Sequence, residues 1–100
     1  MTITLRSQEN IQSLLRRCGY FFVREENGEL AFARPMSSSA SGYPRFHIYA
    51  KLDNVSRETL LNLHLDQKKP SYGGTAAHSG EYNGEVVERE AARIRQILGL

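Results

Sequence analysis

Cysteine is scarce in this sequence, and long apolar runs are missing from it. The single cysteine, Cys18, excludes an intramolecular disulfide and a zinc site made of cysteine thiolates. Cys18 takes an apolar position of a predicted helix, which favours a core thiol over a nucleophile. No segment approaches the roughly 18 apolar residues of a membrane span, and the first residues lack a signal peptide's apolar stretch. These absences predict a cytoplasmic protein without a membrane partner.

Net charge is also small. The formal charge of +2 identifies no partner by itself. The chain has 100 residues, the length of one ordinary domain, with 40% hydrophobic and 24% charged residues. This composition is typical of a globular protein and argues against a wholly disordered chain. We therefore expect one domain, residues 1–100, with one core.

A short amphipathic helix is predicted near the beginning of the chain. Ser7 is the expected N-cap, and Gly19 is placed to end the helix. The apolar positions at helical spacing are Ile11, Leu14, Leu15 and Cys18.

Asn27-Gly28 is the strongest local signal for a hairpin, and it joins residues 20–26 to residues 29–35. A two-residue turn there would place Val23 opposite Phe32 and Phe21 opposite Arg34. One face would then carry Phe21, Val23, Leu30 and Phe32, and the other Tyr20, Phe22, Ala31 and Ala33. Both faces are fairly apolar, so we expect the hairpin to be covered on both sides.

A second pair of strands follows residues 36–44, a small-residue segment that predicts a flexible linker. Residues 45–53 and 61–66 each alternate between apolar and polar side chains. We expect them to be antiparallel neighbours with one core face and one polar face. The polar face would collect His47, Tyr49, Lys51, Asn62, His64 and Asp66.

The last element is a second amphipathic helix, with Asn83 as its expected N-cap. Its apolar stripe is Val87, Ala91, Ile94 and Leu98, and its arginines are expected to form a solvated face. The resulting fold class is α+β: a helix, a four-stranded antiparallel sheet made of two hairpins, and a C-terminal helix. Both helices would cover one face of the sheet, which leaves the other face open to solvent or a partner.

The long connection over residues 67–83 has no secondary-structure period, and compact domains seldom carry such a connection unless it is functional or disordered. Four candidate catalytic residues lie in or beside it: His64, Asp66, His78 and Glu81. His64 and Asp66 are two apart on a strand, so they leave the same face about 7 Å apart.

Three interpretations of these residues stay open. His64, Asp66 and His78 would suit a divalent transition metal. Without a metal, a histidine oriented by an aspartate acts as a general base. In a purely structural role, His64 would hydrogen-bond loop backbone and Asp66 would cap a turn.

Basic and aromatic residues indicate nucleic-acid binding instead. The candidates are Arg45, Tyr49, Lys51, Lys68, Lys69 and Tyr72. Basic side chains contact phosphates, and tyrosines stack on unpaired bases.

Leu14-Leu-Arg-Arg-Cys-Gly-Tyr-Phe-Phe-Val-Arg24 and the residues through Gly28 to Pro35 resemble the start of HicA-type toxins. The shared elements are a leucine-bearing helix, a Gly-aromatic strand start, a Val-Arg pair and a turn glycine. The resemblance implies a double-stranded-RNA-binding-like fold that contacts RNA. The family's catalytic histidine follows the turn glycine, where this chain has Glu29 and Leu30, so no catalytic residue is carried over.

We therefore expect a small cytoplasmic domain that binds nucleic acid, RNA above all, or serves as an accessory to such binding. It would use the polar sheet face and the 67–82 loop. One alternative is a metal-dependent hydrolase with a divalent ion held by His64, Asp66 and His78. The other is a structural module or one that binds a protein partner.

Overall fold

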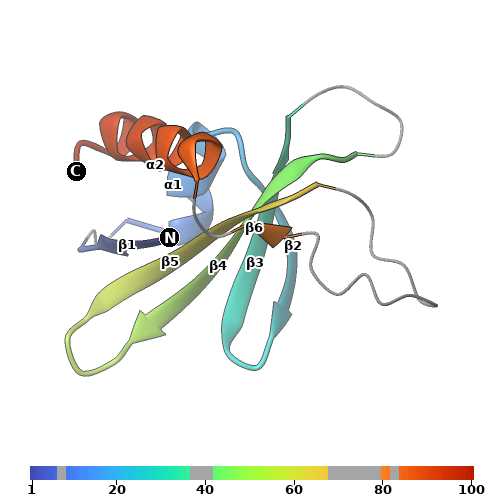
Figure 1. Cartoon of the computed structure of the whole chain (residues 1–100). Helices are drawn as coiled ribbons and strands as arrows, with labels where there is room; N and C mark the ends of the chain where they lie inside the picture. The colour runs from blue at the N-terminus through green and yellow to red at the C-terminus, as the bar shows by residue number, and fades with distance from the viewer. Residues whose placement is uncertain (7–8, 37–41, 68–79, 82–83) are drawn as a thin grey trace.

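The computed structural model describes residues 1–6, 9–36, 42–67, 80–81 and 84–100. The elements are β1 (Thr2–Leu5), α1 (Ile11–Arg17), β2 (Phe21–Glu26), β3 (Glu29–Pro35), β4 (Arg45–Asp53), β5 (Glu58–Asp66), β6 (Gly80–Glu81) and α2 (Glu85–Leu98). The α+β class is confirmed (Figure 1). Neither helix in the described part of the chain has the length and apolar character needed to cross a bilayer.

The sheet is antiparallel, with the strand order β1-β5-β4-β3-β2. The prediction of four strands was wrong, because β1 adds a fifth strand by pairing Thr2 with Asn62 and Leu5 with Thr59. The two residues of β6 pair with the far end of β5. β1 has the alternation of exposed and buried residues that marks a strand. At four residues, that pattern is too short to stand out in the sequence.

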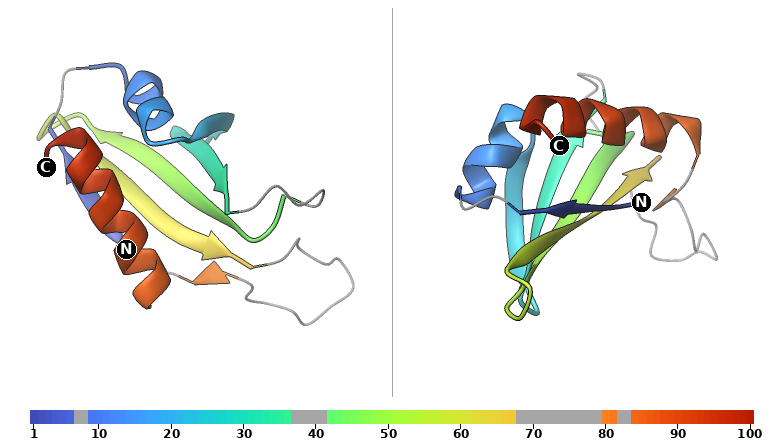
Figure 2. Two further views of the ribbon diagram at one scale, coloured as in Figure 1. Left: turned by 90° about the horizontal axis from the view of Figure 1, so that it is seen from above. Right: turned by 90° about the vertical axis from the view of Figure 1, so that its left-hand side faces the viewer.

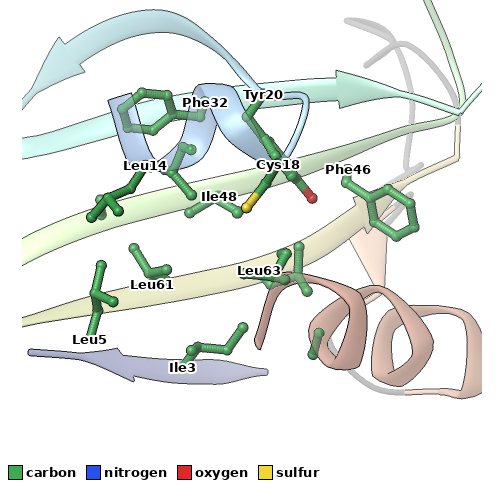
Figure 3. Close-up of a cluster of buried hydrophobic side chains, with 14 of the residues drawn as sticks. Ile3, Leu5, Leu14, Cys18, Tyr20, Phe32, Phe46, Ile48, Leu61 and Leu63 are labelled. Atoms are coloured by element: carbon green, nitrogen blue, oxygen red, sulfur yellow. The ribbon is translucent and has the colours of Figure 1, made fainter. Parts of the chain in front are cut away.

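Both helices pack on the same face of the sheet, as Figure 2 shows. The core lies between them and the sheet (Figure 3). Its largest fully buried side chains are Ile3, Leu15, Phe32, Ile48, Leu61, Leu63, Val87 and Ile94. Because side chains alternate along a strand, the intervening residues of β4 and β5 lie on the face that neither helix covers.

The ends of the helices are set by local backbone chemistry. Asn10, rather than Ser7, is the N-cap of α1, and its side chain accepts from the backbone N–H groups of Gln12 and Ser13 at 2.8 and 3.2 Å. Ser7 and Asn83 lie outside the described residues. Gly19 follows α1 with φ +92°, a left-handed conformation that suits glycine and ends the helix as predicted.

The Asn27-Gly28 turn is confirmed, with positive φ at both residues and Glu26 paired with Glu29. Farther from the turn, the predicted register was wrong. A bulge between Phe22 and Arg24 places Phe22, instead of Val23, opposite Phe32. One extra residue moves every earlier side chain of the strand to the other face. Phe21 accordingly pairs with Ala33 rather than with Arg34.

The ends of the 36–44 segment are tied together, because the backbone N–H of Met36 donates to the carbonyl of Pro44 at 3.0 Å. Residues 37–41 of this predicted linker lie outside the part of the chain that the structure describes.

A buried carboxylate joins the C-terminal helix to the rest of the fold. The hydroxyl of Tyr20 donates to Glu90 at 2.7 Å, and Arg34 and Arg93 pair with the same carboxylate at 3.3 and 2.8 Å. Arg93 also donates to the carbonyl of Cys18, so it is not the solvated side chain that the sequence predicted. Burial raises the pKa of the Cys18 thiol, which agrees with a core position.

Candidate metal centre

Strand register brings two histidines together on the face without helices. His47 in β4 and His64 in β5 are direct cross-strand partners. Asp66 lies two residues beyond His64, so its side chain leaves the sheet on the same side. The backbone of Asp66 is paired with Arg45 on one side and Gly80 on the other. The three side chains therefore project from hydrogen-bonded strands rather than from an unpaired strand end.

The carboxylate of Asp66 lies between the two imidazole rings. The Nδ1–H of His47 donates to one carboxylate oxygen, and the Nε2–H of His64 donates to the other at 3.1 Å. One ligand atom from each of the three residues lies within 4.8 Å of the others. Among the residues that the structure describes, this is the only group of three or more His, Cys, Asp or Glu residues with such convergence.

The centre is largely removed from solvent. His47 is 6% exposed and His64 is 5% exposed, although they lie on the face away from the helices. Tyr49 stacks against both rings, with its centroid 5.4 Å from that of His64 and 5.9 Å from that of His47. The Nε2 atom of His47 is buried and has no hydrogen-bond partner among the described residues.

Burial keeps both histidines uncharged near neutral pH. Loss of hydration lowers the pKa of each ring, and this effect outweighs the opposing attraction of Asp66. The charge of Arg45 lowers the pKa of His47 further. Neutral imidazole is the form that binds metal ions, so both rings are in the charge state that metal binding needs.

The predicted ligands are only partly brought together. His64 and Asp66 do share a face, as the alternation of residues 61–66 predicted. His78 lies outside the described residues, and Glu81 is described only through its backbone pairing with Leu65. The second imidazole of the cluster is His47, which the sequence placed on the polar face but not among the ligands. The signal that identifies it is the register between β4 and β5.

The predicted structural role can be compared with the structure for Asp66 only, because most of the loop proposed to bond His64 lies outside the described residues. Asp66 accepts hydrogen bonds from two imidazoles, whereas the sequence suggested a turn cap. This pairing links adjacent strands through polar side chains.

Of the residues predicted to bind nucleic acid, some lie on the face of the metal centre and others lie outside the described residues. Arg45, Tyr49 and Lys51 lie on the same face of β4 as His47. The guanidinium of Arg45 lies 4.5 Å from the centroid of the Tyr43 ring, while Lys51 is exposed. Lys68, Lys69 and Tyr72 lie outside the described residues.

Comparison with models of known protein families, with curated proteins and with solved structures finds no match to this chain. The resemblance to HicA-type toxins therefore stays a prediction.

Proposed function

We propose that this chain binds a divalent transition-metal ion through His47, His64 and Asp66. The observation that supports the proposal is the convergence of their ligand atoms within 4.8 Å in a buried position. Imidazole nitrogen and carboxylate oxygen are ligands of zinc and of neighbouring divalent metals. Two neutral imidazoles and one carboxylate would leave the loaded centre with a net charge of about +1.

The geometry requires only a modest adjustment. Ligands about 2.0–2.2 Å from a tetrahedral zinc ion lie roughly 3.4 Å from one another. The Asp66 carboxylate already lies 3.1 Å from Nε2 of His64, and the ligand atoms of all three residues lie within 4.8 Å of one another, so small side-chain movements would reach that spacing. To bind the metal, each neutral ring would shift its proton from the nitrogen that faces Asp66 to its other nitrogen, so both imidazoles would stay neutral. Because β4 and β5 already hold the side chains, little ordering accompanies binding.

Three protein ligands are also the arrangement of catalytic zinc sites, in which water or substrate takes the remaining position. A metal-bound water loses a proton near neutral pH and becomes a nucleophile. Metal-dependent hydrolysis is therefore the reaction class that we assign to this centre. The ligand set contains His47 in addition to the His64 and Asp66 of the sequence hypothesis.

Thermal unfolding with and without metal tests the proposal. At free zinc of 100 times Kd, binding adds about 2.7 kcal/mol to the free energy of unfolding. For a domain of this size, that raises Tm by about 10 °C or more. His47→Ala and His64→Ala should abolish the increase, while Glu25→Gln, an exposed carboxylate change in β2, should retain it.

If the alanine variant unfolds, His47→Gln provides a milder version of the same test. Glutamine preserves much of the side-chain volume of histidine. A chain whose Tm is unchanged by zinc, cobalt and manganese would refute metal binding. A zinc response that survives in both histidine variants would refute this ligand set.

A second candidate function is binding of single-stranded nucleic acid, RNA in particular, on the same face. The observation that favours it is the partly exposed Tyr49 ring beside a hollow of about 220 Å³, which Arg24 also lines. A base stacked on such a ring contributes about 1–3 kcal/mol. Tyr49→Ala should then weaken binding of a short single-stranded RNA, and the affinity should fall steeply with salt. No salt-sensitive binding to RNA or DNA would refute it.

A further inference from the structure

We propose that the metal-loaded centre binds a phosphate group, with one oxygen on the metal and others on the guanidinium of Arg45. This inference rests on the proposed metal site and names the chemical class of its ligand. It assigns Arg45 a binding role that is separate from holding the metal.

The position of Arg45 is the first argument. It is the cross-strand partner of Asp66 and lies two residues before His47, so it borders two of the three metal ligands on one face. No ion pair between Arg45 and Asp66 occurs in the described structure, where the carboxylate instead contacts both imidazoles. The positive charge of Arg45 therefore lies beside the centre without forming an ion pair with the Asp66 carboxylate.

The bonding of Arg45 is the second argument. Its Nε atom is buried and has no hydrogen-bond partner among the described residues. Its guanidinium lies over the ring of Tyr43 at 4.5 Å from the centroid, and this contact does not use the hydrogen of Nε. A buried donor without a partner is costly, and a ligand oxygen would satisfy it.

Charge and shape identify the ligand class. Two neutral imidazoles, one carboxylate and a divalent ion sum to about +1, and Arg45 raises the local charge to about +2. An anion is therefore favoured in the open position of the metal. The planar guanidinium matches two oxygens of a phosphate, which also coordinates divalent metals. A free phosphate ion, a phosphate monoester and a phosphodiester share this chemistry.

Cobalt-substituted protein allows metal and phosphate binding to be measured separately. Cobalt is titrated first and followed by its visible absorption, and inorganic phosphate is then added. We expect phosphate to change the spectrum of the loaded protein and to bind the metal-free protein far more weakly. Arg45→Gln should weaken phosphate binding by about tenfold or more, because a charge-assisted contact is lost, while cobalt affinity is retained.

Lys51→Gln is the matched control. It removes one positive charge from the same strand and face, six positions along β4 from Arg45, at an exposed site. Its phosphate affinity should stay within about twofold of the unaltered chain. Arg45→Lys should restore only part of the affinity, because it keeps the charge but loses the two-pronged geometry.

Equal phosphate affinity in the unaltered chain and in Arg45→Gln, with cobalt bound to both, would overturn this inference and leave the metal site standing. No cobalt binding in the first titration would instead refute the proposed function. Dimethyl phosphate, a diester, and phenyl phosphate, a monoester, then distinguish the possible sources of the bound phosphate group. Tighter binding of the diester supports a nucleic-acid backbone as the ligand, and tighter binding of the monoester supports a small phosphate ester.

Discussion

His47 is the residue on which the candidate centre depends. It is the cross-strand partner of His64, donates to Asp66 and keeps a buried ring nitrogen without a hydrogen-bond partner in the described structure. Buried polar groups stabilise a fold less than apolar side chains of the same size. The proposed metal site would account for an arrangement with this cost.

The two histidines make the stability of the metal-free protein depend on pH. Their folded-state pKa values lie below the ordinary value of 6.5, so the folded state favours the uncharged rings. As pH falls below the unfolded-state pKa, the unfolded chain takes up more protons than the folded chain, and the free energy of unfolding decreases. The stabilisation is fully present above that pKa and is lost as pH falls through the lower folded-state values.

Urea denaturation in the presence of a chelator, between pH 5 and pH 8, measures this effect. Each histidine contributes a slope of at most about 1.4 kcal/mol per pH unit. A His47→Gln/His64→Gln double variant should lose this part of the slope and retain the remaining pH dependence. An identical slope in the double variant would show that these rings are not held uncharged.

Glu90 gives a stability prediction that is independent of the metal. Glu90→Gln removes the charge that Arg34 and Arg93 share and weakens the acceptor of the Tyr20 hydroxyl. Both arginines keep about a third of their side-chain exposure, so we expect a cost no larger than the lower limit for breaking a buried pair, about 3 kcal/mol. Chemical denaturation measures it. Glu88→Gln, an exposed change on the same helix, should cost less than about 0.5 kcal/mol, and equal losses would contradict the network.

At the scale of elements, the sequence predicted strands and turns better than registers. The alternation of residues 45–53 marks β4 with its observed bounds, and Asn27-Gly28 forms the turn that it predicts. The bulge at Val23 has no signal in the local pattern, because both faces of β2 are fairly apolar. β1 pairs with β5, a strand nearly sixty residues away in the sequence. A pattern of four residues is too short to predict that pairing.

β1 should contribute strongly to stability despite its length. Ile3 is fully buried, and the backbone N–H of Leu63 donates to the carbonyl of Met1 beside it at 2.8 Å. Ile3→Ala should lower the free energy of unfolding by about 2–5 kcal/mol, measured by urea denaturation. Thr4→Ala changes the next, exposed residue of the same strand and should have little effect. Similar effects of the two changes would mean that β1 does not contribute to the core.

At the scale of the whole molecule, the two faces of the sheet differ in what they carry. The helices bury one face, and the candidate centre lies on the other. His64 and Asp66 are predictable from one strand's alternation, whereas His47 requires the register between β4 and β5. The short turn from Asp53 to Glu58 sets that register, since counting back from this pair aligns His47 with His64. Function and stability should therefore respond to different substitutions, with Ile3 affecting stability and His47 affecting metal binding.

The most direct test of the metal centre is long-range proton–nitrogen NMR of the histidine rings during zinc titration. The chain has three histidines, so the signals can be assigned by substituting each in turn. We predict that one nitrogen in each of His47 and His64 shifts on coordination, with saturation at one zinc per chain. Unchanged ring nitrogens in these two residues at saturating zinc would contradict the metal centre.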